Sequence, residues 1–238
     1  MQMMRRLWRW VWQLALAFVL LSVALVTLYH WVDPPLTPLM LIRSVEGLLA
    51  GERVGIDRRW VSLSKVSPAL LRAVIAAEDA RFFQHWGVDL KELRSSRAYN
   101  ARQRDDRLRG ASTITMQCAR SVFLWPGRTY VRKALEVYFT ILLEQLWGKR
   151  RILEVYVNVV EWGSGIYGVE AASRHYFGLS AAQLDGERAA LLAAALPAPR
   201  RFDPAAPSAY LRRRAGTIAA RAKQVELGPS PRRASLDE

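Results

Sequence analysis

The strongest pattern along the chain is a long apolar run near its N-terminus. Val11 to Val32 contains no formally charged residue and is rich in Leu, Val and Ala, whereas the residues before it include Arg5, Arg6 and Arg9 and no acid. As a helix this run would extend roughly 33 Å, enough to cross a hydrocarbon core of about 30 Å. The pattern predicts one transmembrane helix over 11–32, preceded by a cytoplasmic basic tail over 1–10.

A cleaved signal peptide is the alternative interpretation of this run. Signal peptides have a shorter apolar region, about 7–15 residues, that ends in small residues at the cleavage site. The run here is longer, and Leu28 to Trp31 is a poor place to cleave. Tyr29 and Trp31 also resemble the aromatic belt of a membrane interface. We therefore favour an uncleaved anchor, which would leave everything after Asp33 outside the cytoplasm.

Beyond the run, the spacing of apolar positions predicts one mainly α domain over 33–228, followed by a flexible tail over 229–238. Asp33 to Pro38 is rich in proline and predicts an extended exit from the membrane. The next stretch, to about Ser64, is mixed, so we expect short strands or irregular structure there. The helices that we expect are Ser67 to Ala77, Lys91 to Arg109 (a helix plus a loop), Ser112 to Phe123, Thr129 to Trp147, Lys149 to Asn158, Val169 to Phe177, Ser180 to Leu196 and Ser208 to Glu226.

Charge narrows the range of partners. The chain has 35 Lys and Arg against 21 Asp and Glu, a formal net charge of +14. Such a chain binds nucleic acid, lies against anionic lipid or is simply soluble. Because an exported domain rarely meets nucleic acid, the anchor favours a phosphate-bearing lipid as substrate. The single cysteine, Cys118, excludes an intramolecular disulfide and matches no metal-ligand spacing.

Two acids at the end of an apolar run are the first candidates for chemistry. Glu78 and Asp79 close the run Ala73 to Ala77, and Phe82 and His85 follow. A carboxylate at the end of a buried helix is partly desolvated, which raises its pKa and makes it a better base near neutral pH. Taken alone, the segment also fits a helix end with exposed acids and a core aromatic pair.

Two further groups have the composition of anion sites. In Gly110 to Gln117, small and hydroxyl-bearing residues precede a predicted helix, and the free N–H groups at its start would bind an anion. Arg120 could add a fixed positive charge. Arg132, Lys133 and Glu136 are spaced to share one helix face, where cations that clamp phosphates could hold the carboxylate. An ordinary capped helix and an exposed salt-bridge face are the respective alternatives.

The pattern Gly163-x-Gly165-x-x-Gly168 formally satisfies the dinucleotide-binding fingerprint. A predicted helix precedes it in place of a clean strand, and no strand–helix–strand continuation follows. We interpret the match as a coincidence in a loop over 163–168.

Together and in this order, the segments resemble the peptidoglycan glycosyltransferases, which comprise monofunctional biosynthetic enzymes and the glycosyltransferase half of class A penicillin-binding proteins. The resemblance covers roughly residues 40–226. The matching segments are Glu78 to Gly87, Gly110 to Gln117, Arg132 to Glu136, Lys149 to Asn158 and Gly168 to Gly178. Phe123 to Arg128, and a chain without room for a transpeptidase domain, resemble the monofunctional type of Gram-negative bacteria.

The resemblance implies a lysozyme-like fold, mostly helical, with a head and a membrane-dipping jaw around a cleft. It implies a single-pass enzyme of the cell inner membrane, with its N-terminus cytoplasmic and its catalytic domain periplasmic. Lipid II would be donor and acceptor, and would be polymerised into β-1,4-linked glycan strands by an inverting single displacement that releases polyprenyl pyrophosphate. Other cell-wall synthesis or division proteins are possible partners.

The resemblance also implies residue roles. We expect Glu78 to remove the proton from the acceptor's 4-hydroxyl, and Glu136 to hold the neighbouring cations in place and contact the donor. The residues expected to bind substrate are Asp79, Phe82, His85, Ser112, Thr113, Gln117, Arg120, Arg132, Lys133 and Asn158. A divalent cation, Mg²⁺ or Mn²⁺, could assist at the pyrophosphate, with ligands that the sequence does not identify.

The chain departs from the family's usual pattern at three positions. Met116 stands where the family usually has a first Gln, and Arg120-Ser121 stands where it usually has Lys-Asn. Arg in place of Lys keeps the charge but changes the hydrogen-bond geometry, so the details of substrate binding are affected.

Three other functions stay open. A lysozyme-like hydrolase or lytic transglycosylase would use a lone glutamic acid as a proton donor, but it has no use for a cationic cluster near that acid. An inactive scaffold of a cell-wall complex is the second, and a basic nucleic-acid binder is the third.

Overall fold

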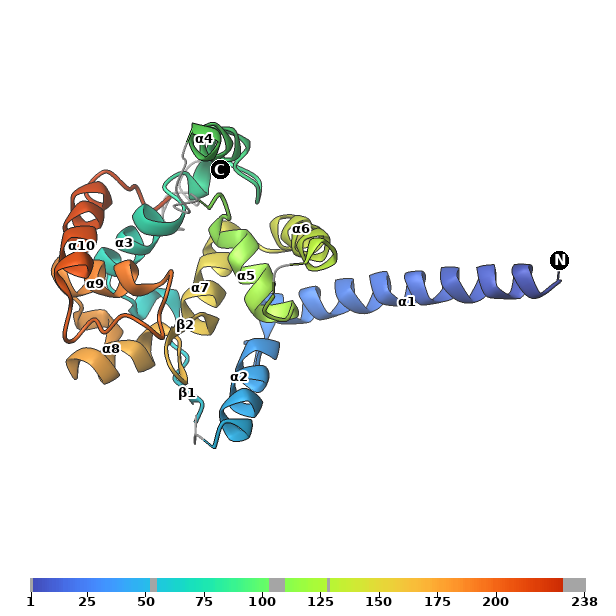
Figure 1. Cartoon of the computed structure of the whole chain (residues 1–238), viewed down its shortest axis with the longest axis horizontal. Helices are drawn as coiled ribbons and strands as arrows, with labels where there is room; N and C mark the ends of the chain where they lie inside the picture. The colour runs from blue at the N-terminus through green and yellow to red at the C-terminus, as the bar shows by residue number, and fades with distance from the viewer. Residues whose placement is uncertain (1, 52–54, 103–109, 128, 229–238) are drawn as a thin grey trace, which may run out of the picture.

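One long helix extends away from a group of shorter helices (Figure 1). The computed structural model describes residues 2–51, 55–102, 110–127 and 129–228. In this part of the chain, α1 (Gln2–Trp31, 30 residues) is the one helix long and apolar enough to cross a membrane. The predicted apolar run is helical, and the helix includes the basic segment before it. The predicted tail over 229–238 lies outside the described residues, as do Arg128 and residues 103–109, the last part of the expected helix plus loop over Lys91 to Arg109.

The C-terminal half of α1 packs against the domain, whereas the N-terminal half is exposed. Val26 is fully buried, and its carbonyl oxygen accepts a hydrogen bond from Nε1 of Trp147 at 2.8 Å. Nearer the middle of the helix, Ser22 Oγ lies 2.6 Å from the hydroxyl oxygen of Tyr138. The ring of Phe18 also contacts that of Tyr138. The helix is therefore fixed to the domain over about half its length.

The stretch to about Ser64 begins with a helix over 38–49, where the expectation of short strands or irregular structure was wrong. Farther along it, β1 (Asp57–Arg58) is a short strand, as expected. α2 (Pro38–Leu49) begins with a proline in its first turn, and Thr37 is its N-cap, accepting the N–H of Met40 at 3.3 Å. A capping threonine followed by proline is a helix start, whereas Gly47 in the same stretch favours a break. Gly47 is buried inside the helix.

Six of the remaining described helices form two packed groups. α3 (Pro68–Glu78) packs with α9 (Gly186–Ala195) and α10 (Ala209–Ala222), and α5 (Ile114–Phe123) packs with α6 (Tyr130–Leu146) and α7 (Lys149–Val159). The other described elements are η1 (Leu63–Lys65), η2 (Phe82–Gln84), α4 (Leu90–Arg102), α8 (Val169–Phe177) and η3 (Ala181–Gln183). The mainly α fold expected from the apolar spacing is confirmed.

A small sheet replaces the predicted loop over 163–168. β2 (Glu161–Gly163) pairs antiparallel with β3 (Ile166–Tyr167), and β1 (Asp57–Arg58) pairs parallel with β3, in the order β1-β3-β2. Gly163 and Gly165 therefore lie in a hairpin, and Gly168 follows β3 as the N-cap of α8. The fingerprint needs all three glycines in one turn between a strand and a helix, so this arrangement agrees with its interpretation as a coincidence.

Two helix starts differ from the predictions. The N-cap of α5 is Thr113, one residue after the expected Ser112. The capping box at Ser180 closes a single 3₁₀ turn, and α9 then starts separately from the N-cap Asp185. The expected single helix from Ser180 to Leu196 is thus two elements, because a second capping residue, Asp185, follows shortly after the 3₁₀ turn.

Candidate active site

A cleft of about 530 Å³ opens between the end of α3, the start of α5 and α10. The side chains of its lining that bear on chemistry are Glu78, Asp79, Ser112, Thr113, Gln117, Arg214 and Arg221. Five of these were predicted site residues, from two segments of the sequence, and the fold brings them together.

Glu78 is the last residue of α3 and combines burial with a directed hydrogen bond. Burial raises the pKa of its carboxyl group, the hydrogen bond from Gln117 and the charges of Arg214 and Arg120 oppose this rise, and Asp79 adds to it. Gln117 Nε2 donates to Glu78 Oε2 at 2.8 Å. The desolvation predicted for a carboxylate at this helix end is confirmed.

Gln117 is itself oriented by a residue that the sequence analysis did not single out. The hydroxyl of Tyr156, on α7, donates to Gln117 Oε1 at 3.1 Å. Burial raises the pKa of Tyr156 well above its usual value, so this hydroxyl stays protonated and remains a donor. Because the Gln117 oxygen accepts from Tyr156, its amide nitrogen must face Glu78.

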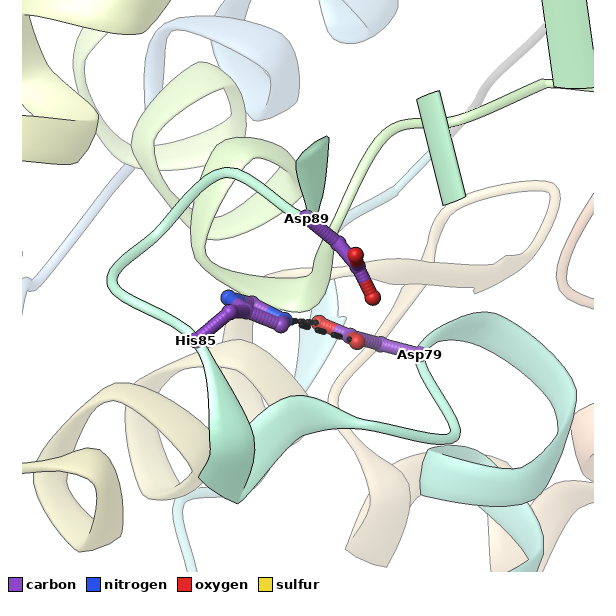
Figure 2. Close-up of side chains that lie close together, drawn as sticks. All are labelled: Asp79, His85 and Asp89. Carbon is purple, nitrogen blue, oxygen red and sulfur yellow. Dashed lines mark hydrogen bonds and ion pairs between the residues drawn. The ribbon is translucent and has the colours of Figure 1, made fainter. Parts of the chain in front are cut away.

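Asp79, which lines the cleft, forms a buried pair with His85 (Figure 2). His85 Nε2 lies 2.9 and 3.1 Å from the two carboxylate oxygens of Asp79. Asp79 also accepts the N–H of Ile114, the first residue of α5, at 3.0 Å. This carboxylate therefore ties the turn after α3 to the start of α5, which places Gln117 opposite Glu78.

Asp89 joins this pair to make a possible metal-binding group (Figure 2). Asp79, His85 and Asp89 are buried, with ligand atoms within 4.8 Å of one another. However, Asp89 Oδ1 already accepts the N–H groups of Lys91 and Glu92, each at 3.0 Å.

The hydrogen bonding of His85 also opposes metal binding. A metal on Nε2 would displace its proton to Nδ1, which is buried without a partner among the described residues. Mg²⁺ and Mn²⁺ prefer oxygen ligands and retain several waters, so this buried group does not fit the expected divalent cation.

A second carboxylate, Glu136 on α6, is fully buried between two cations. Arg132 Nη1 bonds to its Oε2, and Lys133 Nζ bonds to its Oε1 at 2.5 Å. Glu136 thus holds both cations, as expected from their spacing. Having no exposed surface, it cannot also contact a donor sugar in this conformation.

Lys133 connects this cluster to the cleft. Its Nζ lies 3.5 Å from Oγ of Ser112, which lines the cleft, and its side chain is 42% exposed. Arg132 keeps a buried Nε without a hydrogen-bond partner in the part of the chain that the structure describes. Arg120 is half-buried on α5, one turn after Gln117, and acts on Glu78 through its charge.

Two predicted binding residues lie in the protein interior. Phe82 is fully buried, with Lys149 Nζ 4.6 Å from the centre of its ring. Asn158 is also fully buried, and its amide bonds to both the N–H and the carbonyl of Val61, at 2.9 and 2.8 Å. Neither side chain has a surface from which to touch a substrate, so in this structure both act on the fold.

Thr113 is also engaged within the protein, capping α5 and donating its hydroxyl to the carbonyl of Gly87. The departures at Met116 and Ser121 are 5% and 7% exposed. They therefore change the interior face of α5 and leave the cleft-facing positions unaffected.

The cleft contains cations that the sequence analysis left unassigned. Arg214 and Arg221 come from α10, which the sequence predicted as a helix and to which it gave no role. Arg214 Nε donates to the carbonyl of Ala194 at 3.1 Å, which fixes the side chain between α9 and the cleft. Several arginines crowd this helix, and nothing in their spacing marks Arg214 as the one that influences Glu78.

Comparison with known proteins agrees with this geometry. A family model described as "Transglycosylase" matches residues 47–223. The chain is 51% identical over 218 residues to a biosynthetic peptidoglycan transglycosylase of Rhodospirillum centenum, covering 92% of this chain and 91% of the relative. A relative of the same name from Caulobacter vibrioides is 50% identical over 207 residues, covering 86% of this chain and 87% of the relative. One from Pseudomonas putida is 46% identical over 209 residues, covering 88% and 87%. With a family model over most of its length and relatives at this identity, the chain belongs to the transglycosylase family, alongside the biosynthetic peptidoglycan transglycosylases.

Proposed function

We propose that this chain polymerises lipid II into β-1,4-linked glycan strands during bacterial cell-wall synthesis and releases polyprenyl pyrophosphate. The family and the relatives named above support a peptidoglycan glycosyltransferase. The observation that carries the mechanism is a desolvated carboxylate, Glu78, held by Gln117 in a cleft next to fixed cations.

Glu78 acts as the general base. Its carboxylate takes the proton from the 4-hydroxyl of the acceptor lipid II while that oxygen attacks the anomeric carbon of the donor. The bond from this carbon to the pyrophosphate oxygen breaks, and the electron pair leaves with polyprenyl pyrophosphate. One displacement converts the α-linked donor into a β-1,4 bond. Burial supports this role, because a carboxylate whose pKa is raised is a stronger base near neutral pH.

The cations near the cleft stabilise the departing diphosphate. Lys133 is held by Glu136 yet remains partly exposed beside Ser112, so its ammonium can reach an anion without losing its position. Arg120 and Arg132 add fixed positive charge nearby. Preorganised charges of this kind stabilise a developing anion without reorganising during the reaction.

The anchor keeps the cleft close to a substrate whose lipid stays in the bilayer. We place the span at 11–32, with residues 1–10 cytoplasmic and 33–228 periplasmic, since arginines precede the apolar run. α6 contacts α1 at Phe18 and Ser22, inside this span. The side of the domain carrying α6 would therefore enter the bilayer through the outer leaflet and reach about its middle, which suits the exposed Tyr130 and Ile141. Association with other cell-wall synthesis or division proteins stays a prediction.

Incubation of the detergent-solubilised full chain with labelled lipid II tests the proposal. Long glycan strands, blocked by a phosphoglycolipid antibiotic, are the expected product. Cleavage of isolated cell wall without polymer formation would instead identify a hydrolase or lytic transglycosylase. Failure in both assays by a folded protein would favour the scaffold. A shift of DNA in a gel would be needed to revive nucleic-acid binding.

A further inference from the structure

α2 presents an apolar face that the fold leaves uncovered. Leu41, Val45, Leu48 and Leu49 are 51%, 55%, 75% and 83% exposed. At 100° per residue these four positions lie in one sector of the helix, which we call the apolar face of α2. Scattered exposed leucines are ordinary, whereas a contiguous apolar surface marks a binding site for a partner or a membrane.

The other sectors of α2 contact the domain or carry charged residues. Met40 and Gly47 are buried against it. Arg43 and Glu46 form an ion pair of 2.6 Å on a polar sector, and Arg43 Nε lies 3.6 Å from Glu161 of β2. The polar sector thus faces the small sheet, and the apolar face lies on the opposite side of the helix.

The position of α2 indicates what covers this face. Six residues, Val32 to Thr37, separate it from the end of α1, and two of them, Val32 and Leu36, add exposed apolar surface of 48% and 46%. Figure 1 shows α2 running across the direction of α1, with β1 and β2 on the side away from the free end of α1. The apolar face of α2 lies opposite the sheet and is therefore directed toward the side on which the free end of α1 lies.

We propose that α2 lies in the interface of the outer leaflet, with its apolar face in contact with lipid and its polar sector toward the domain. This inference rests on the proposed anchorage of α1. An amphipathic helix parallel to the bilayer buries its apolar face at the boundary between headgroups and acyl chains. A single spanning helix leaves the domain free to rotate about the membrane normal and to tilt. α2 provides a further contact, at an angle to α1 and apart from the side that carries α6, which fixes the tilt of the cleft toward lipid headgroups.

Site-specific spin labels on the full chain test this arrangement. The native Cys118 is fully buried, so single cysteines can be introduced elsewhere in its presence. The parent protein, taken through the same labelling reaction, is the background control. The variants are Leu48→Cys on the apolar face, Ala50→Cys on the polar side at the end of the same helix, and Leu14→Cys on α1. Each is reconstituted into vesicles of phosphatidylethanolamine and phosphatidylglycerol. Collision rates with oxygen, which partitions into lipid, are compared with those of a water-soluble nickel chelate.

The inference expects oxygen collisions to dominate at Leu14→Cys and Leu48→Cys, and nickel collisions to dominate at Ala50→Cys. A lipid-exposed label at 14 with a water-exposed label at 48 would overturn the role of α2 and leave the anchorage standing. A water-exposed label at 14 would overturn the anchorage and this inference with it. Protection of position 48 from both reagents would mean that protein covers the face, and lipid exposure at both 48 and 50 would mean that α2 is inserted whole. Either result would also overturn the proposal.

Discussion

At the scale of single residues, the proposed base depends on a chain of hydrogen bonds from three helices. Tyr156 on α7 fixes Gln117 on α5, and Gln117 donates to Glu78 at the end of α3. Each partner is buried or half-buried, so a poorly aligned donor would cost more here than in water. The orientation of the carboxylate is thus set by residues that do not themselves react.

Tyr156→Phe should slow polymerisation while the fold persists. Without the hydroxyl, the Gln117 amide loses its fixed orientation and donates less reliably to Glu78, so the rate should fall roughly 3- to 10-fold. Because the Gln117 hydrogen bond lowers the pKa of Glu78, its weakening should move the acid limb of the pH–rate profile upward. Tyr176→Phe, which loses a hydroxyl bonded to Trp162 outside the cleft, is the control. Equal effects of the two variants would contradict the positioning role.

Arg214 should set the pH at which Glu78 becomes active. Its positive charge favours the carboxylate, so Arg214→Gln should raise the pKa of Glu78 further. The base is active when ionised, and the acid limb of kcat/KM should therefore move to higher pH. Arg213→Gln removes the same charge from an exposed neighbour on α10 and should leave the limb in place. Identical profiles for the two variants would show that only net charge matters.

At the scale of elements, local signals predicted most helices, and long-range contacts decided the exceptions. Thr129 followed by an amphipathic pattern predicted α6, and its Thr129 cap is present. α2 was missed because Gly47 resembles a break, whereas its lack of a side chain suits a buried helix position. The spacing of Arg132, Lys133 and Glu136 predicted their shared face, since both contacts of Glu136 are with residues three or four positions before it on the same helix.

In the candidate active site, too, contacts within one segment could be predicted from the sequence and contacts between segments could not. Gln117 lies 39 residues from both Glu78 and Tyr156, so no local pattern indicates that all three meet. Asn158 belongs to a segment that matches the family, yet the described contacts of its amide are with backbone groups of the protein. A matching segment therefore identifies important residues without separating those that hold the fold from those that face the cleft.

The junction between β3 and α8 should be sensitive to a single methyl group. Gly168 has φ of +80°, and an added Cβ would lie 2.8 Å from the carbonyl oxygen of Asn158. Gly168→Ala should therefore destabilise the protein by about 1–3 kcal/mol. Gly186→Ala, at the first residue of α9 with open space around it, should stay within about 1 kcal/mol of the parent. Chemical denaturation in one detergent compares them, and equal stability would contradict the close approach.

At the scale of the whole molecule, α1 is part of the folded domain as well as the proposed anchor. Its Tyr29 ring packs near Phe123, and Arg151 donates to the Tyr29 carbonyl at 2.9 Å. Val26 is fully buried beside Trp147. The part of α1 nearest the domain thus completes a hydrophobic surface that α5, α6 and α7 leave open.

Removal of residues 2–31 should destabilise the domain as well as detach it. Loss of the buried Val26 alone removes about 1.5–3 kcal/mol of apolar burial. The expected result is a lower melting temperature in the same detergent. Removal of residues 2–10 alone, a segment that is exposed throughout, should leave the melting temperature unchanged. An unchanged value for the longer deletion would mean that α1 serves purely as a tether.

Polymerisation of labelled lipid II by Glu78→Gln tests the central claim most directly. Loss of the base should lower the initial rate at least about 100-fold. The control is Glu187→Gln, which makes the same change at an exposed glutamate on α9 and should leave the rate unchanged. Because burial raises the pKa of Glu78, its ionised form destabilises the fold near neutral pH, so Glu78→Gln should melt no earlier than the parent there. That advantage should vanish in acid, where Glu78 is protonated. A well-folded Glu78→Gln protein that extends glycan strands at the parent rate would contradict the account.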